Sequence, residues 1–237
     1  MRGFKFFKDK SVFHCFTPEV MLATILFESA LAVYTFVRYG SGLFGRLAGA
    51  ILVLLAVFQT AEYHICTGVN EFFWSEIGFV AITFLPVLGY HLVSLITGKN
   101  RILKFGYALA FLFSLYFIFA PNSITEPVCT GNYVIFHTAQ KLSWLFSVYY
   151  FGFLFAAAGV ALKFLHSLKK THEKNDALLW FLVGYLSFLL PMALAYMTMG
   201  LAPKTIPSIM CGFAIIFALI LGLKVVPVYY ANRISKN

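Results

Sequence analysis

Residues 47–66 read LAGAILVLLAVFQTAEYHIC, a run of 20 mostly apolar residues in which Glu62 is the only carboxylate. A helix of about 20 apolar residues is long enough to cross the hydrocarbon core of a bilayer. The whole 237-residue chain has this character, because 61% of its residues are hydrophobic and only 11% are charged. A soluble domain carries about 25% charged residues. The composition therefore predicts a membrane protein.

Seven apolar runs fill most of the chain, and we expect each of them to be a transmembrane helix. The runs are residues 18–37, 47–66, 73–97, 105–121, 133–165, 177–200 and 206–228. Residues 1–17 form a basic, Phe-rich N-terminal segment, and residues 229–237 form a short tail. The predicted fold is an all-α integral membrane protein, a bundle of seven transmembrane helices that occupies residues 18–228.

Lysine and arginine in the connections predict the orientation, because cytoplasmic loops carry an excess of these residues. Twelve of them fall on the side that holds the C-terminal tail: Arg38, Arg46, Lys99, Arg101, Lys104, Lys163, Lys169, Lys170, Lys174, Lys224, Arg233 and Lys236. Five fall on the other side: Arg2, Lys5, Lys8, Lys10 and Lys204. We expect the N-terminus outside, the C-terminus inside, and no nucleic-acid partner, since the positive charge is spread over short loops.

Three ionisable residues lie inside the predicted spans: Glu28, Glu62 and Lys141. A charge in hydrocarbon costs roughly 2.5–3.5 kcal/mol on insertion scales, so such residues indicate a functional site or a buried pair. Glu62 and Lys141 lie four and eight residues from the outer ends of their spans, and we expect them to pair. Glu28 lies near mid-membrane with no such partner, and we expect a neutral carboxylic acid there.

Other polar residues share helix faces with these charges. Gln59 and Glu62 are three residues apart on the second span, and His137 lies one turn before Gln140 or Lys141 on the fifth. We therefore predict a polar pocket that opens outward in the outer half of the bundle. Its ligand-binding residues are Gln59, Glu62, His137, Gln140, Lys141, Glu28 and Thr83. The alternative is that these residues only join helices through hydrogen bonds.

Cysteines on the predicted outer side suggest a disulfide, because that compartment permits disulfides. Cys66 with Cys129 is the simplest pairing, and Cys15 with Cys66 is the alternative that the sequence leaves open. Cys15, Glu62, Cys66 and His137 are also acceptable ligands for zinc or copper. Their spacing matches no known metal motif, so the sequence identifies no metal and no cofactor.

Signatures of known enzymes do not occur in the chain, so the sequence does not favour an enzyme. It contains no GxSxG elbow, P-loop or GxGxxG motif, and no HxxxH motif in the last span. Lys224 lies near the inner end of that span, whereas retinal binding needs a lysine in mid-membrane.

Short stretches of the sequence resemble a family of uncharacterised bacterial seven-helix membrane proteins. These proteins have a Cys-Phe-Ser/Thr start before the first helix and a Gln-x-x-Glu on the second. The matching stretches are HCFTPE at 14–19, FQTAEYHIC at 58–66 and ITFLPVLGYH at 82–91. The resemblance implies a bacterial inner or plasma membrane and implies no activity. The matching positions are Cys15, Phe16, Gln59 and Glu62.

A looser similarity links the chain to the seven-helix sensor regions that precede histidine kinases. Because the sequence continues for only about ten residues after the last span, we expect a sensor of this kind to signal through a separate partner. The favoured function is a receptor-like or sensor module that binds a small molecule or an ion within the lipid bilayer.

Two other functions remain as alternatives. One is a small proton-coupled transporter or channel in which Glu28 titrates and the helices bend at Pro86 and Pro191. The other is a metal-assisted membrane enzyme that acts on lipid, with Glu62 or His137 as general base.

Overall fold

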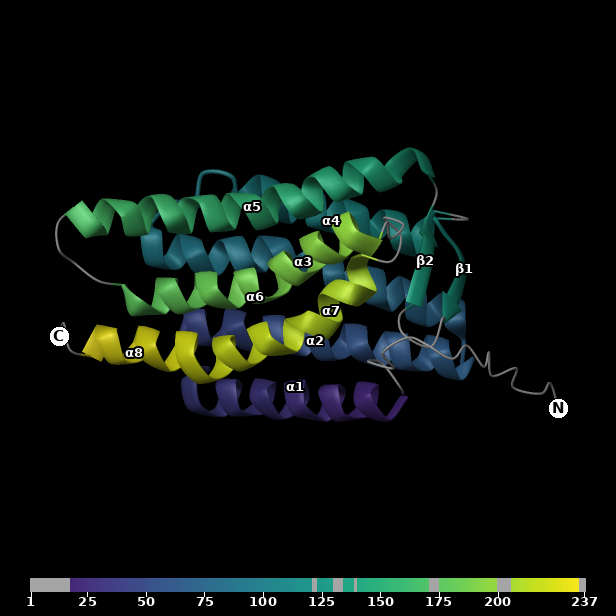
Figure 1. Ribbon diagram of the computed structural model, residues 1–237, viewed down its shortest axis with the longest axis horizontal. Helices are drawn as coiled ribbons and strands as arrows, with labels where there is room; N and C mark the ends of the chain where they lie inside the picture. The colour runs from purple at the N-terminus through teal and green to yellow at the C-terminus, as the bar shows by residue number, and fades with distance from the viewer. Residues whose placement is uncertain are drawn as a thin grey trace.

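A computed structural model of the chain describes residues 18–120, 123–129, 134–138, 140–170, 175–199 and 206–234. The helices are α1 (Pro18–Tyr39), α2 (Leu43–Thr67), α3 (Glu71–Thr97), α4 (Leu103–Phe119), α5 (Gln140–Lys170), α6 (Asp176–Met199) and α7 (Ile206–Ile220). A π-helical turn, η2 (Leu221–Val225), joins α7 to α8 (Val226–Ile234) without a break. The described residues thus form seven helical rods, which lie along one common direction (Figure 1).

The lengths of the helices agree with the predicted spans. Five are long and apolar enough to cross a membrane: Glu19–Tyr39, Leu43–Thr67, Glu71–Thr97, Trp144–Leu168 and Phe213–Arg233. Two shorter apolar helices, Leu103–Phe119 and Asp176–Pro191, lie among them. The prediction of a helical bundle is confirmed, and the count of seven membrane crossings stays a prediction.

The start of the fifth predicted span is wrong. Residues 133–165 were expected as one helix, but α5 begins at Gln140 and strand β2 (Val134–Thr138) precedes it. This strand pairs antiparallel with β1 (Ile124–Cys129), with Val134 opposite Cys129. A run of five residues is too short for the spacing of its apolar residues to distinguish a strand from a helix. Here the pairing with β1 makes the run a strand. The two strands lie at one end of the bundle (Figure 1).

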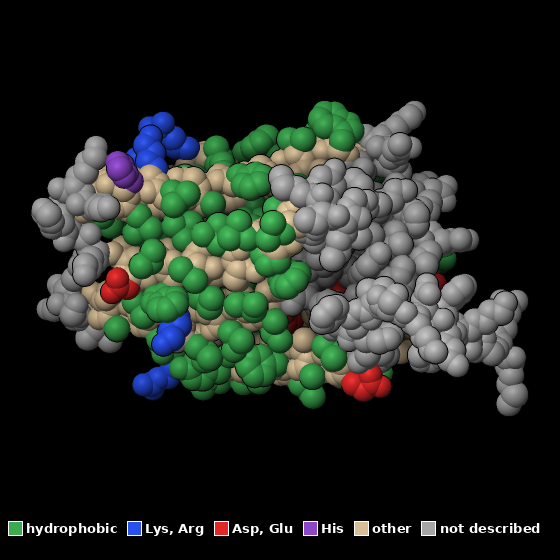
Figure 2. Space-filling view, in the orientation of Figure 1, with side chains coloured by type: hydrophobic (Ala, Val, Ile, Leu, Met, Phe, Trp, Pro, Cys, Tyr) green, Lys and Arg blue, Asp and Glu red, His purple; other side chains and the backbone are tan. Residues whose placement is uncertain are grey.

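Apolar side chains cover the outside of the bundle, and polar ones lie within it. Val37 on α1 and Phe119 on α4 are 83% and 74% exposed, whereas Glu28 on α1 is 1% exposed. Figure 2 shows apolar side chains across the middle of the molecule, with lysine and arginine side chains towards the end away from the strands. A soluble protein rarely exposes such continuous apolar surface, and lipid is the solvent that suits it.

Helices α1 and α2 form an antiparallel pair in close contact. A Cβ built at Gly45 would lie 2.0 Å from the Tyr39 carbonyl oxygen, and one built at Gly49 would lie 2.7 Å from the Phe36 ring. Only glycine permits this approach, as at many helix contacts in membranes. The hydroxyl of Tyr230 on α8 completes the turn by donating to the Tyr39 carbonyl at 3.1 Å.

A proline lies inside α3, and a tyrosine from α5 bonds to the helix backbone beside it. Pro86 has no N–H, so the carbonyl of Ile82, four residues earlier, loses its helical donor. The carbonyl of the next residue, Thr83, accepts a hydrogen bond of 2.7 Å from the buried Tyr149 hydroxyl. This bond joins α5 to α3 at the turn that precedes the proline.

Replacing Tyr149 with phenylalanine should therefore destabilise the α3–α5 contact by about 1 kcal/mol, because the Thr83 carbonyl loses its donor. Thermal unfolding of the purified variant measures the loss. Tyr116→Phe is the matched control, since Tyr116 is a partly buried tyrosine of α4 for which no hydroxyl hydrogen bond is seen among the described residues. Equal stability of Tyr149→Phe and wild type would show that this hydrogen bond contributes nothing to the α3–α5 contact.

Candidate functional site

Most buried hydroxyls of the bundle are satisfied within their own helix. Thr24 donates to the Met21 carbonyl at 2.7 Å, and Thr83 donates to the Phe79 carbonyl at 2.6 Å. Other hydroxyls do the same, among them those of Thr60, Ser75, Ser94 and Ser114. Hydroxyls bonded in this way are held in the helix and need no ligand. Buried polar groups that lack such a bond are therefore exceptions in this bundle.

Three almost wholly buried side chains on α1 and α2 break this pattern, and the half-buried His64 on α2 joins them with an unsatisfied Nδ1 atom. Glu28 Oε2, Gln59 Oε1 and Thr35 Oγ1 are buried and have no hydrogen-bond partner in the part of the chain that the structure describes. The three residues are 1%, 1% and 0% exposed. An unsatisfied buried polar atom costs roughly 1–3 kcal/mol, and a bound ion or water molecule commonly removes that cost. These atoms therefore mark the candidate site.

Glu28 and Gln59 lie on two neighbouring antiparallel helices. Glu28 precedes Tyr39 by eleven residues, and Gln59 follows Gly45 by fourteen residues. The two residues therefore lie about 16 Å and 21 Å along their helices from the turn that joins α1 to α2. Both are buried at similar levels of the bundle.

Thr35 lies apart from this pair, two turns further along α1. It packs beside Gly222, where a built Cβ would lie 3.7 Å from the Thr35 hydroxyl oxygen. Gly222 belongs to η2, the π-helical turn of the last rod. Thr35 is not among the predicted ligand-binding residues, and its only sequence signal is that it continues the stripe of Thr24 and Glu28.

The other predicted ligand-binding residues are placed as follows. Glu62 is buried on α2 one turn beyond Gln59, and Thr83 is buried on α3 and bonded within its helix. His137 lies in β2 opposite Thr125, so its expected place on a stripe of the fifth helix is wrong. Lys141 is the second residue of α5, so its expected depth of eight residues is also wrong.

The side chains of His137, Gln140 and Lys141 lie outside the described residues. The pairing of Glu62 with Lys141 and the outward polar pocket therefore stay predictions. The structure buries the predicted residues on α1 and α2, namely Glu28, Gln59 and Glu62.

A disulfide joins Cys66 at the end of α2 to Cys129 at the end of β1, with the two Cα atoms 5.2 Å apart. This is the pairing that the sequence favoured, and Cys15 lies outside the described residues. Because Cys66 is in a disulfide, its sulfur is not available as the metal ligand that the sequence also allowed. Among the described residues, no three His, Cys, Asp or Glu side chains are grouped so that they could hold a metal ion.

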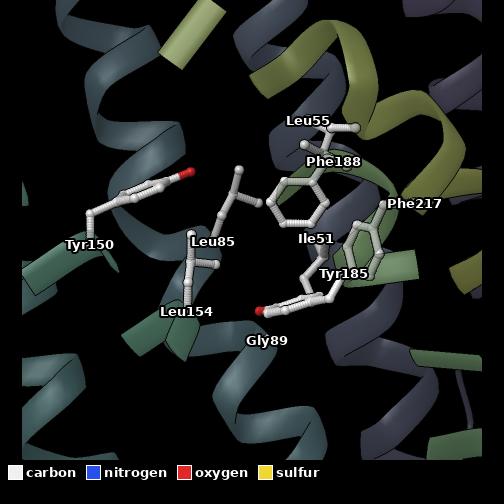
Figure 3. Close-up of a pocket in the computed structure, with 10 residues that line it drawn as sticks. Ile51, Leu55, Leu85, Gly89, Tyr150, Leu154, Tyr185, Phe188 and Phe217 are labelled. Atoms are coloured by element: carbon white, nitrogen blue, oxygen red, sulfur yellow. The ribbon is translucent and has the colours of Figure 1, made fainter. Parts of the chain in front are cut away.

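A small cavity of about 40 Å³ lies elsewhere, in the centre of the bundle. Its lining comes from five helices and includes Leu55, Leu85, Gly89, Tyr150, Tyr185 and Phe217. Figure 3 shows the two tyrosine hydroxyls directed towards the space between the apolar side chains. None of the predicted ligand-binding residues lines it.

The cavity lies between the two helices that carry an internal proline. Leu85 and Gly89 flank Pro86 of α3, and Tyr185 lies six residues before Pro191 of α6. Gly89 is required because a Cβ there would lie 2.0 Å from the Tyr185 hydroxyl oxygen. The two prolines were noted from the sequence, but their position on either side of one space follows only from the packing.

Comparison with models of known protein families and with curated proteins finds no match to this chain. The resemblance to bacterial seven-helix membrane proteins therefore stays a prediction that rests on three short stretches of sequence.

Proposed function

We propose that this chain is a seven-span protein of a bacterial inner or plasma membrane, with its N-terminus outside and its C-terminus inside. The distribution of charge supports this orientation. The basic side chains that the structure describes lie at or towards the end of the bundle where α1, α3, α5 and α8 terminate. They are Arg38, Arg46, Lys99, Arg101, Lys104, Lys163, Lys224 and Arg233. The disulfide lies at the other end, as an oxidising outer compartment requires.

We further propose a receptor-like module that binds a small ligand in a polar layer between α1 and α2. The observation that carries this proposal is the presence of two buried, unsatisfied oxygens on neighbouring helices, Glu28 Oε2 and Gln59 Oε1. Buried ionisable groups in membrane helices are costly, and they commonly mark a ligand or ion site. Glu62 continues the layer towards the disulfide end, where Gln140 and Lys141 begin α5. Such a module would pass its signal to a separate partner.

A thermal-shift screen of the purified protein in detergent tests the receptor proposal. A ligand of this layer at about 100 times its Kd should raise the Tm of wild type by about 5 °C or more. Glu62→Gln should lose most of that shift, because it removes a charge from the layer. Thr60→Val is the matched control, since the Thr60 hydroxyl on the same helix is bonded to the Ala56 carbonyl. A ligand that stabilises Glu62→Gln and wild type equally binds elsewhere and counts against the proposal.

A small transporter is the second candidate, and the central cavity favours it. Transporters commonly bind their substrate near mid-membrane, between helices whose regular backbone is interrupted. The cavity here lies between the proline-containing helices α3 and α6, and two tyrosine hydroxyls face it. Solute uptake by proteoliposomes is the measurement that separates a transporter from a receptor.

A further inference from the structure

We propose that the cavity in the centre of the bundle binds a small neutral molecule that has an apolar body and one hydroxyl group, a short alcohol. The inference concerns the cavity that favours the second candidate function, and binding there requires no transport. Three properties of the cavity lead to this class of ligand. They are an unbonded tyrosine hydroxyl, a lining without charged side chains, and a volume of about 40 Å³.

A tyrosine hydroxyl supplies the polar contact. Tyr185 on α6 is 2% exposed, and Figure 3 shows its hydroxyl directed into the cavity. No hydrogen-bond partner for this hydroxyl is seen among the described residues. Gly89 on α3 makes room for the hydroxyl, because a Cβ there would lie 2.0 Å from its oxygen. A buried hydroxyl without a partner costs roughly 1–3 kcal/mol, and a ligand that forms a hydrogen bond with it removes that cost.

The rest of the lining is apolar, so the ligand must be neutral and mostly apolar. Apart from two tyrosines, the described lining residues are isoleucine, leucine, glycine, alanine and phenylalanine. No charged side chain is among them, and an uncompensated charge in an apolar interior is costly. Water suits the cavity poorly, because a buried water molecule typically makes about three hydrogen bonds. The second tyrosine of the lining, Tyr150, has an interaction of its own.

The volume limits the ligand to a few non-hydrogen atoms. One water molecule needs a cavity of about 10–15 Å³, so the cavity of about 40 Å³ accommodates about three non-hydrogen atoms. Benzene is too large, since it occupies an apolar cavity of about 150 Å³ in a protein engineered to bind it. Ethanol has the right size, its hydroxyl can form a hydrogen bond with that of Tyr185, and its alkyl group suits the apolar lining.

Saturation-transfer NMR of ethanol with the purified full-length protein in lipid nanodiscs tests the proposal. Wild type should give a saturable signal above that of empty nanodiscs, which correct for alcohol dissolved in the lipid. Tyr185→Phe should weaken binding by about 3- to 10-fold, because one neutral hydrogen bond is lost. Ala214→Leu should abolish binding, because the larger side chain occupies the cavity. Tyr116→Phe should bind like wild type, since Tyr116 does not line the cavity. Ethylammonium, a charged molecule of the same size, should not bind.

Three results would overturn the proposal. One is a wild-type signal no larger than that of empty nanodiscs. Another is binding that Tyr185→Phe and Ala214→Leu both retain in full, which would place the alcohol elsewhere. The third is ethylammonium binding as tight as that of ethanol. The wild-type titration needs no variant, so the proposal stays testable if a variant fails to fold. If ethanol does not bind while another ligand stabilises wild type and not Glu62→Gln, the receptor proposal stands and only the cavity ligand is lost.

Discussion

Breaking the Cys66–Cys129 disulfide should lower the free energy of unfolding by roughly 4 kcal/mol, the loop-closure entropy expected for a crosslink of this span. The two cysteines are 63 residues apart in sequence, so the bond closes a loop that contains α3 and α4. It also holds the two-stranded sheet against the end of α2. A two-stranded hairpin is at best marginally stable alone, so β1 and β2 should lose their position when the bond is cut.

Unfolding of oxidised and reduced wild type, Cys66→Ser and Cys129→Ser measures this effect. Both variants and the reduced protein should unfold at the same lowered midpoint, and the double variant should lose nothing further. Reductant should leave Cys129→Ser unchanged, which controls for effects on other cysteines. A reduced wild-type protein as stable as the oxidised one would show that the bond does not constrain the fold.

Gly45→Ala should destabilise the protein by about 2 kcal/mol or more, because the new Cβ meets main-chain atoms. The position of that Cβ is 2.0 Å from the carbonyl oxygen and 2.6 Å from the carbonyl carbon of Tyr39. A flexible side chain could turn aside, but a backbone carbonyl at the end of α1 can move only if the helix moves. The change should therefore separate α1 from α2 at this turn.

Gly152→Ala on α5 is the matched control for this prediction. A Cβ at Gly152 meets nothing within 4 Å, so the same substitution adds no contact there. Alanine has the higher helix propensity, so Gly152→Ala should leave stability unchanged or raise it by up to about 1 kcal/mol. Thermal unfolding of both variants in one detergent measures the difference. Equal losses in the two variants would mean that the α1–α2 contact is not tightly packed.

The helices could be predicted because their signal is local. The predicted apolar runs end close to the ends of α1, α2, α3 and α6. The lysines and arginines of the connections lie mostly at one end of the bundle. Where the signal was short, the prediction failed. Residues 134–138 are apolar enough to continue a helix, yet they pair with residues 124–129 as a strand. That failure also misplaced Lys141, which begins α5 and does not lie deep within it.

The sequence singled out Glu28, Gln59 and Glu62 because polar groups in hydrocarbon are costly wherever they lie. The structure buries all three of these side chains. The expected pairing of Glu62 with Lys141 stays a prediction, because the Lys141 side chain lies outside the described residues.

The order of residues along the chain is enough to establish a bundle of apolar helices and the residues buried against their polarity. These properties depend on the length and composition of single segments. The choice of Cys129 as the partner of Cys66 and the location of empty space, such as the cavity beside Gly89, emerge only when the elements pack. This is because close contacts such as that of Gly45 with Tyr39 set the rotation and neighbours of each helix, and no single segment encodes them.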